Sequence, residues 1–296
     1  MKMDCNTCKV QNKDYQSENL FTWCTNCGNY GINGSLRRAL VDMQLAPHEV
    51  MLCYDVGCNG NGADKIEANT FHGLHGRVIP FACGAKLGNY DMPVIASGGD
   101  GSTLGEGINH LIHAIRHNYN ITFILHNNRN YGLTTGQASP TTPEGYAMNS
   151  TPDGVPSAPM EVHEMVFASN PSFYARTWSG NVKQMTYLIK EAINHQGFSM
   201  IEVLQDCPTY NKATPHEWYM ERVYDVSSRL NYDRADKEQA RKLAADLDNK
   251  IATGVLYHNP RKTFYDNYKG HLGLSTLKDG VRLKNDVAQQ LLTKYI

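Results

Sequence analysis

Residues 96–137 read ASGGDGSTLGEGINHLIHAIRHNYNITFILHNNRNYGLTTGQ, and this stretch decides the fold. A short apolar run leads into Gly-Asp-Gly at 99–101, where the glycines allow tight backbone turns around one carboxylate. Apolar residues then recur at helical spacing over 104–115. A second apolar run, 121–125, ends in Asn-Asn at 127–128. The pattern predicts a strand, a helix and a second, parallel strand.

The two polar positions that follow these predicted strands are Asp100 and Asn128. Parallel strands joined by a crossover helix end side by side, and ligands bind outside their carboxyl ends. Carboxylate and amide oxygens suit Mg²⁺, and the start of the helix offers free N–H groups to phosphate oxygens. The competing interpretation is an ordinary turn in which Asp100 caps the helix.

Four of the eight cysteines stand at turns. Cys24 and Cys27 form a CxxC before a predicted helix, while Cys58 and Cys207 follow predicted strands at 50–54 and 198–204. Four thiolates can hold a [4Fe–4S] cluster or Zn²⁺, and any one of them taken singly is equally a small buried hydrophobe. One close pair with two distant singles favours a cluster over structural zinc.

The other cysteines are interpreted differently. Cys53 lies in mid-strand and Cys83 in mid-helix, so both are expected in the core. Cys5 and Cys8 form a second CxxC in a polar segment that is expected to be a mobile tail.

Composition excludes several classes of protein. The chain has 296 residues and a net charge of −1, without a basic stretch, so nucleic acid is not an expected partner. No apolar run reaches the ~20 residues of a membrane span, and the N-terminus has no apolar signal region. The expectation is a cytoplasmic protein without membrane contact.

Strands and helices alternate from Val50 to Leu204, which predicts an α/β fold with a doubly wound parallel sheet. We expect a polar tail at 1–20, the main α/β domain at 21–212 and a C-terminal helical arm at 213–296. Within the arm, residues 233–250 and an amphipathic segment at 283–295 are expected to be helical. A loop at 137–160, rich in Thr, Ser, Pro and Gly, is expected to be functional because of its length.

Gly-Asp-Gly, 25 residues and Asn-Asn together resemble the thiamine diphosphate motif, so the expected sheet is of the thiamine diphosphate-binding type. The tail NYGLTTGQ at 130–137 narrows the resemblance to the β chain of the 2-oxoacid:ferredoxin oxidoreductases. The segments WCxxCGN, GCNG and DCPTYN look like the cluster-binding segments of that chain, in the same order.

The resemblance implies three cofactors: thiamine diphosphate, Mg²⁺ and one [4Fe–4S] cluster. Asp100, Asn128 and the carbonyl of Asn130 would ligate Mg²⁺. His75 would be a catalytic residue that binds near the diphosphate, although from the sequence it could equally be a helix cap or a surface residue. The cluster ligands implied are Cys24, Cys27, Cys58 and Cys207. The cofactor-binding residues implied are Gly57, Cys58, Asn59, His75, Gly99, Asp100, Gly101, Ser102, Asn128, Asn130, Tyr131, Gly132, Leu133 and Thr134.

The implied activity is the coenzyme A-dependent oxidative decarboxylation of a 2-oxo acid, pyruvate or 2-oxoglutarate, with electrons passed through the cluster to ferredoxin. The glutamate that activates thiamine has no second domain to carry it, so the resemblance implies a partner α chain. Some members carry a base soon after the third cluster cysteine. In this sequence the first base is Lys65, and its role is open.

Three other functions remain compatible with the residues. A non-oxidative thiamine-dependent decarboxylase would share Gly-Asp-Gly and Asn-Asn but would not need four thiolates. A non-enzymatic iron–sulfur subunit would not need Asp100 and Asn128. A zinc-stabilised binding protein would be colourless and would not need Mg²⁺.

Overall fold

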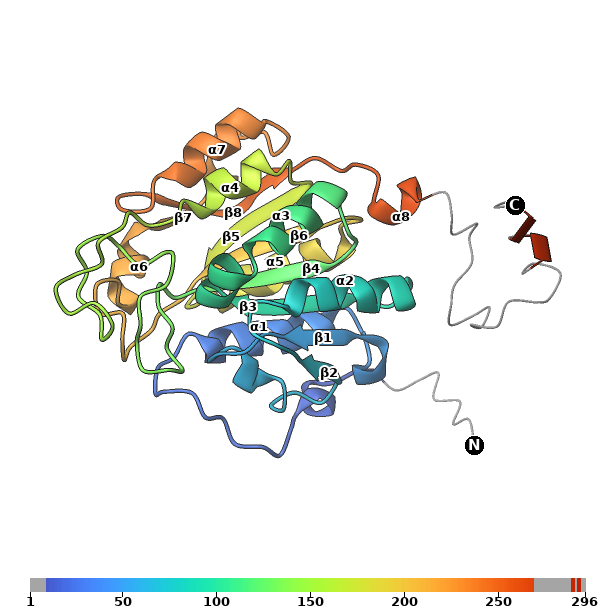
Figure 1. The fold of residues 1–296 in the computed structure, drawn as a ribbon, viewed down its shortest axis with the longest axis horizontal. Helices are drawn as coiled ribbons and strands as arrows, with labels where there is room; N and C mark the ends of the chain where they lie inside the picture. Colours follow the sequence, from blue (N-terminus) through green and yellow to red (C-terminus); the bar gives the residue numbers. More distant parts are fainter. Residues whose placement is uncertain (1–8, 269–288, 291, 294–296) are drawn as a thin grey trace.

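The structure is a computed structural model that describes residues 9–268, 289–290 and 292–293. Cys5 and Cys8 lie outside the described residues, as does most of the helix expected at 283–295. Figure 1 shows the described chain as a central sheet covered by helices on both faces.

The sheet that the described residues form has eight strands in the order β2-β1-β3-β4-β6-β5-β8-β7. The neighbours from β2 to β5 are parallel, β8 runs antiparallel to β5, and β7 is parallel to β8. The strands are β1 (Met51–Tyr54), β2 (Asn69–His72), β3 (Val94–Gly99), β4 (Thr122–Asn127), β5 (Phe173–Trp178), β6 (Ser199–Leu204), β7 (Val223–Asp225) and β8 (Ile251–His258).

The helices divide between the two faces of the sheet, which makes the fold doubly wound as predicted. Buried residues of α2, α3, α4 and α7 form one core with the sheet, and those of α1 and α5 form the other. The helices are α1 (Asn29–Asp42), α2 (Val78–Gly88), α3 (Ile108–His117), α4 (Val162–Ala168), α5 (Val182–Asn194), α6 (His216–Arg222), α7 (Lys237–Ala245) and α8 (Phe264–Asn267).

Alternation along the buried strands explains the two cores. In β4, Phe123 and Leu125 pack against the α2 side, whereas Ile124 packs against the α1 side. Successive side chains of a strand point to opposite faces, so an apolar run with both faces covered belongs in a parallel sheet. Cys53 and Cys83 lie in the core on the α2 side, as expected.

The segment after Gly-Asp-Gly is helical as predicted, but its first turns are not α-helical. Residues Gly101–Glu106 form a π-helical turn, and the α-helix α3 begins only at Ile108. Wide turns of this kind occur often at functional sites. Helix α3 ends at His117, and the next residue, Asn118, terminates it with a left-handed φ of 58°.

The C-terminal segment is helical only in part. Helix α7 lies inside the stretch expected to be helical, but the same segment adds β7 and β8 to the sheet. The apolar residues 254–257 belong to β8, where all but the last of its eight residues are buried. Sequence analysis missed this strand because its antiparallel pairing with β5 departs from the strand–helix alternation.

Candidate active site

The ends of neighbouring parallel strands bring the predicted site residues to one edge of the sheet. In the register of β3 and β4, Gly99 lies opposite His126. Asp100 and Asn128 therefore follow strand ends that lie side by side, as the sequence predicted. The loop after β1, which contains Cys58, belongs to the same edge, because β1 pairs with β3.

A cavity of about 570 Å³ opens at this edge, within the size range of ligand pockets. Among the predicted cofactor-binding residues, only Gly99 and Asp100 do not line it. The lining residues are Val56, Gly57, Cys58, Asn59, His75, Gly101, Ser102, Glu106, His126, Asn128, Asn130, Tyr131, Gly132, Leu133, Thr134 and Gln137. The structure therefore collects the predicted cofactor residues around one cavity.

Asp100 is a buried carboxylate next to this cavity, with an exposed fraction of 1%. The hydroxyl groups of Ser139 and Thr141 each donate to its Oδ2 at 2.5 Å. Burial raises the pKa of Asp100, and these hydrogen bonds oppose that rise. A cation at the carboxylate would also favour the ionised form, so the surroundings of Asp100 fit a metal ligand.

Asn128 begins a tight turn at the end of β4. Its Oδ1 accepts the backbone N–H of Asn130 at 3.1 Å, and Arg129 between them has a φ of 60°, in the left-handed region. The carbonyl oxygen of Asn128 accepts from the side chain of Asn211. The amide oxygen keeps a second lone pair, so it remains a possible hard ligand beside Asp100.

Gly101 lets the backbone of the π-helical turn approach Tyr131. A Cβ at Gly101 would overlap the Tyr131 ring, whose hydroxyl donates to the Gly101 carbonyl at 3.0 Å. This close contact requires glycine. It holds the first turn after β3 against the segment after β4, so both walls of the cavity are joined.

The four cysteines implied as cluster ligands lie close together. The pKa of the Cys58 thiol is raised to about 12, first by burial and then by the neighbouring thiols of Cys27, Cys207 and Cys24. The indole N–H of Trp23 donates to the Cys58 carbonyl at 2.6 Å, and the N–H of Gly28 donates to Asp206 at 3.2 Å. These bonds join the three cysteine-bearing segments.

The structure does not by itself identify these thiols as a metal site. Among residues 9–268, 289–290 and 292–293, no group of three or more His, Cys, Asp or Glu side chains could hold a metal ion. The [4Fe–4S] cluster and its four ligands therefore remain a prediction.

His75 lies at the mouth of the cavity, where its Nδ1 is 3.0 Å from Oε2 of Glu106. The backbone directly after His75 is anchored, because the N–H of Gly76 donates to the buried carboxylate of Asp55 at 2.9 Å. Sequence analysis did not identify Glu106 or Asp55. Lys65 does not line the cavity and instead bonds Asp64 at 2.9 Å.

His126 is a further residue that sequence analysis missed. It lines the cavity, and its ring nitrogens lie 2.8 Å from Oγ of Ser97 and 2.9 Å from Oδ1 of Asn29. Burial lowers the pKa of His126 to about 4, so the ring is neutral at physiological pH. The sequence feature that could have identified His126 is its position as the polar residue at the end of an apolar strand, directly before Asn-Asn.

A second cavity, of about 760 Å³, borders the same thiols. It is lined by Cys27 and Cys207, by residues at the start of α1 and α5, and by residues around α6. Cys58 lines the first cavity and not this one. The group of thiols therefore borders both cavities, a feature that the sequence did not indicate.

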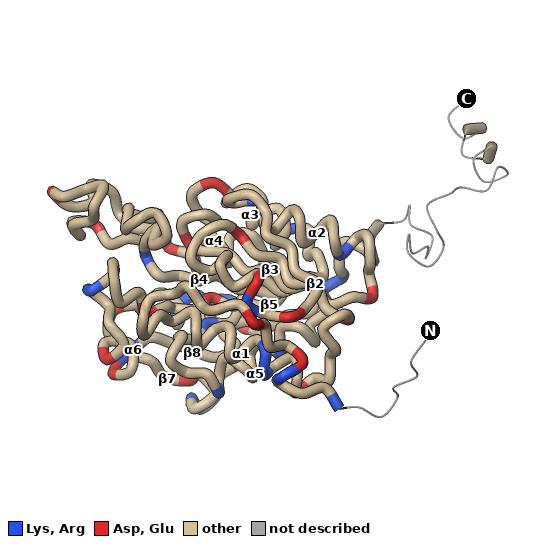
Figure 2. The backbone as a smooth tube through the Cα atoms, turned by 90° about the horizontal axis from the view of Figure 1, so that it is seen from below, with Lys and Arg blue, Asp and Glu red and all other residues tan. Residues whose placement is uncertain are grey.

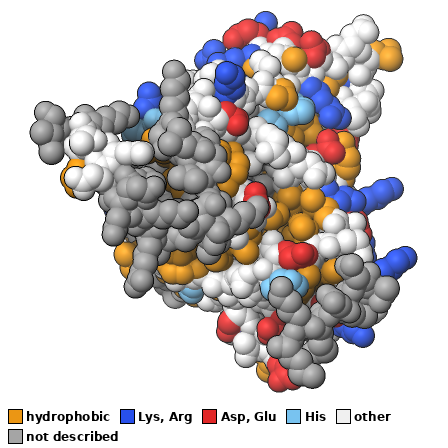
Figure 3. Space-filling view, turned by 90° about the vertical axis from the view of Figure 1, so that its right-hand side faces the viewer, with side chains coloured by type: hydrophobic (Ala, Val, Ile, Leu, Met, Phe, Trp, Pro, Cys, Tyr) orange, Lys and Arg blue, Asp and Glu red, His pale blue; other side chains and the backbone are white. Residues whose placement is uncertain are grey.

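Charge is mixed over the described surface. Acidic and basic residues are interspersed along the backbone in Figure 2 and over the face shown in Figure 3. No helix among the described residues has the length and apolar character needed to cross a bilayer.

Two known family patterns match this chain. Residues 55–203 match the family described as thiamine pyrophosphate enzyme, C-terminal TPP binding domain. Residues 207–271 match the family described as the C-terminal part of the pyruvate ferredoxin oxidoreductase beta subunit. The first match contains every residue that lines the cavity, and the second begins at Cys207.

Curated relatives and one solved structure agree with these matches. The β subunit of 2-oxoacid:ferredoxin oxidoreductase 2 from Aeropyrum pernix is 34% identical over 86% of this chain and 85% of its own length. The β subunit from Saccharolobus solfataricus is 37% identical over 83% and 81%. The 2-oxoglutarate:ferredoxin oxidoreductase from Magnetococcus marinus, solved with 2-oxoglutarate, coenzyme A and succinyl-CoA bound, superimposes with a TM-score of 0.84. It is 31% identical and covers 91% of this chain and 94% of its own.

Proposed function

This chain belongs to the 2-oxoacid:ferredoxin oxidoreductase family as a β subunit, and we propose that it binds thiamine diphosphate, Mg²⁺ and one [4Fe–4S] cluster for oxidation of a 2-oxo acid. The proposed reaction consumes a 2-oxo acid and coenzyme A and yields an acyl-CoA, CO₂ and one proton. Its two electrons reduce two molecules of ferredoxin, one electron each.

The observation that carries this proposal is the shared wall of the cavity. Cys58 lines the cavity beside Asn128 and lies near three other thiols. The same cavity thus borders the soft thiol of Cys58 and the hard oxygen of Asn128, which follows the strand beside the one that Asp100 follows. Hard oxygens select Mg²⁺, whereas thiolates select iron–sulfur clusters.

The residues of this chain have separate parts in the proposed reaction. Asp100, Asn128 and the Asn130 carbonyl would hold Mg²⁺ and through it the diphosphate, and the free N–H groups after Asp100 would face the same phosphates. When bound, thiamine diphosphate supplies the carbanion chemistry of decarboxylation, and the cluster supplies a one-electron acceptor beside it. His75, held by Glu106, would hydrogen-bond a diphosphate oxygen at the cavity mouth.

The cavity is also proposed to be incomplete without a partner. The carboxylate among its described lining residues is Glu106, which is paired with His75. Thiamine activation by a glutamate on the aminopyrimidine would therefore depend on an α subunit that covers the cavity mouth. The exposed side chains of Leu74, which precedes His75, and of Leu133, which lines the cavity, would be buried by that contact.

The substrate is proposed as pyruvate or 2-oxoglutarate. A relative from Archaeoglobus fulgidus that is 35% identical over 70% of this chain is named as a 2-oxoglutarate synthase subunit. Lys65, the first base after Cys58, bonds Asp64 and does not line the cavity. A base that receives the second carboxylate of 2-oxoglutarate would then come from elsewhere.

The test is anaerobic purification of the chain together with its α subunit, followed by metal analysis, a visible spectrum and assays with pyruvate and 2-oxoglutarate. The expected result is about four irons per chain, brown absorbance and ferredoxin reduction that requires coenzyme A. Decarboxylation without iron would favour a non-oxidative thiamine enzyme. Iron without thiamine diphosphate binding would favour an electron-transfer subunit.

A further inference from the structure

We infer that the hydroxyl groups of Ser139 and Thr141 position the metal-binding carboxylate, by binding one oxygen of Asp100 so that the other faces Mg²⁺. The inference rests on the proposed function, because it assumes that Asp100 binds the metal. It adds two residues from the loop after β4, which the motif around Asp100 does not include.

The geometry at Asp100 carries the inference. Both hydroxyl groups lie 2.5 Å from the same atom, Oδ2, and all three residues are buried, with exposed fractions of 6%, 6% and 1%. Two donors occupy the two lone pairs of that oxygen. A cation at Asp100 would then contact Oδ1, on a carboxylate that also accepts from the backbone N–H groups of Asp100 and Gly101, so the carboxylate would bind with one oxygen and its plane would be held in place.

The loop that carries the two hydroxyl groups is braced against the second metal ligand. Ser139 donates its N–H to Oγ1 of Thr142 at 2.8 Å, and that hydroxyl donates to the carbonyl of Arg129 at 2.7 Å. Arg129 is the residue between Asn128 and Asn130 in the turn at the end of β4. One loop therefore contacts both halves of the proposed Mg²⁺ site.

A buried ion pair orients the neighbour of Thr141. The Thr141 hydroxyl also lies 3.0 Å from Oδ1 of Asn127. The amide NH₂ of Asn127 donates to Glu202 at 2.8 Å, and Glu202 pairs with Arg176 at 2.8 Å, both fully buried. Only an NH₂ can face a carboxylate that already accepts from Arg176, so the amide oxygen must face Thr141.

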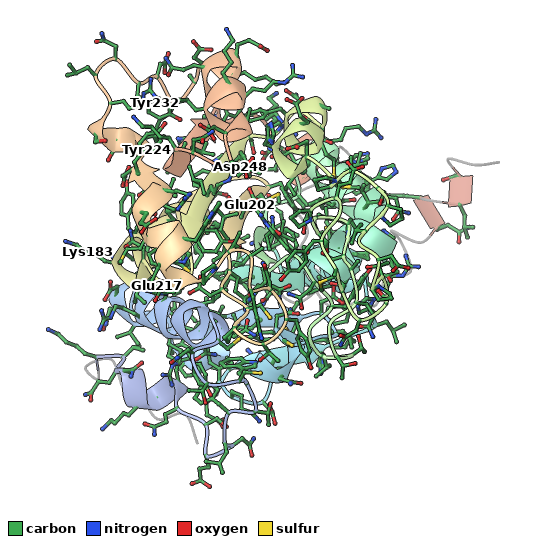
Figure 4. The ribbon with its side chains drawn as sticks, turned by 90° about the vertical axis from the view of Figure 1, so that its left-hand side faces the viewer. Lys183, Glu202, Glu217, Tyr224, Tyr232 and Asp248 are labelled. Carbon is green, nitrogen blue, oxygen red and sulfur yellow. The ribbon has the colours of Figure 1, made fainter. Side chains whose placement is uncertain are left out.

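This ion pair lies deep in the molecule. Glu202 is in β6 and Arg176 in β5, and Figure 4 shows Glu202 in the interior among the strands. A buried ion pair is weak evidence for stability, because desolvation offsets its attraction. The pair holds the Asn127 amide with its oxygen towards Thr141, where it competes with Asp100 for the single hydroxyl proton, and the shorter contact, 2.5 Å against 3.0 Å, is the one to Asp100.

The test compares Mg²⁺ binding in variants of the complex of this chain with its α subunit. Thr141→Val removes the donor and keeps the shape, whereas Thr141→Ser keeps the donor. Calorimetry would measure thiamine diphosphate binding as a function of Mg²⁺ concentration. Partners that orient metal ligands change metal affinity by about 10–100-fold when lost. Thr141→Val should raise the half-saturating Mg²⁺ concentration at least tenfold, and Thr141→Ser should restore it.

A matched control separates positioning from packing. Thr186 is similarly buried, and its hydroxyl donates to the Val182 carbonyl inside α5, remote from the cavity. Thr186→Val should leave the Mg²⁺ requirement unchanged. Ser139→Ala removes the other hydroxyl donor to Oδ2 of Asp100 with a smaller change in side-chain volume. The test can therefore still be made if Thr141→Val fails to fold.

The outcomes distinguish this inference from the proposed function. If Asp100→Ala loses Mg²⁺-dependent binding while Thr141→Val and Ser139→Ala match the parent, the positioning role is wrong and the metal site stands. If Asp100→Ala also binds with unchanged affinity, the proposed metal site itself is wrong. A tenfold loss in Thr141→Val that Thr141→Ser does not reverse would indicate packing and overturn the positioning role.

Discussion

Asp100 is a charged residue that the protein buries almost completely, at the end of β3. Burial of a carboxylate is costly unless hydrogen bonds or a cation compensate, and two hydroxyl groups supply part of that compensation. Asp100 itself stands at the edge of the sheet where Asn128 follows the neighbouring strand β4. Single-residue changes at this edge therefore test the proposed site most directly.

The first prediction concerns Asp100 itself. Asp100→Ala should abolish retention of thiamine diphosphate, because the substitution removes the anionic ligand of Mg²⁺. The fold should persist, since alanine leaves no unpaired buried charge. Calorimetry with thiamine diphosphate and Mg²⁺ would measure the loss, and circular dichroism would check the fold. Unchanged affinity would show that Asp100 is not the metal ligand.

The second prediction concerns the thiol group. Cys207→Ser should bleach the brown absorbance of the anaerobically purified complex, because loss of one thiolate exposes an iron. Electron delivery to ferredoxin should stop, as followed by its reduction. The matched control is the double variant Cys5→Ser with Cys8→Ser, which should change neither colour nor rate. If the control loses its iron and Cys207→Ser keeps it, the N-terminal CxxC is the cluster site.

At the scale of an element, helix α2 shows a buried charge that serves no predicted function. Lys86 in α2 is 5% exposed, and its Nζ donates to the carbonyl of Met92 at 2.9 Å. Burial lowers the pKa of Lys86 from 10.5 to about 8. Burial of the charged amine of Lys86 therefore lowers the free energy of unfolding at every pH at which the folded protein keeps that amine protonated.

The third prediction follows from the sign of this shift. Below pH 8 the Lys86 amine is protonated in both the folded and the unfolded state, so the full cost of burying its charge reduces stability. Between pH 8 and 10.5 only the unfolded state keeps the proton, so the free energy of unfolding rises with pH. Lys86→Met should raise the free energy of unfolding at pH 7 by about 1–3 kcal/mol, with a smaller difference as pH rises to 10.5.

Urea denaturation of the apo chain across this pH range would measure the effect. Lys183, an exposed lysine labelled in Figure 4, provides the control, and Lys183→Met should change stability by less than about 0.5 kcal/mol. A difference between Lys86→Met and the parent that stays constant up to pH 10.5 would contradict the penalty assigned to Lys86.

At the scale of the whole molecule, the sheet carries both candidate ligand groups on one edge. The cavity lined by Cys58 and Asn128 is open there, and Leu74 and Leu133 beside it are exposed. Relatives of this chain are named as β subunits, which implies an α subunit. An open cofactor cavity with exposed apolar neighbours is what a missing subunit would leave.

The fourth prediction is that the chain is inactive alone. Purified without a partner, it should not decarboxylate pyruvate or 2-oxoglutarate, because no described carboxylate of the cavity is free to activate thiamine. Addition of the α subunit should restore CO₂ release, measured with a carboxyl-labelled 2-oxo acid. Robust turnover by the lone chain would show that the activating group is in this chain.

Local patterns in the sequence were enough to predict the doubly wound sheet and the residues that gather at its edge. Apolar runs that end in a glycine-rich loop predicted β1 and β3, and the run that ends in Asn-Asn predicted β4. Parallel strands in one sheet then bring their carboxyl ends to the same edge. The division into a tail, a main domain and an arm remains a prediction. The ligands of Mg²⁺ and of the cluster also remain predictions, although the structure brings their side chains together.

Only the tertiary structure decided the contacts between distant segments. The strand β8 joins the sheet beside β5 although its sequence follows no strand–helix repeat. Thr141 reaches Asp100 across 41 positions, and His126 reaches Asn29 across 97. Periodicity and turn residues report on neighbours within a few positions. Hydroxyl, amide and ring groups find partners only after packing sets their distances, so a linear pattern carries no sign of them.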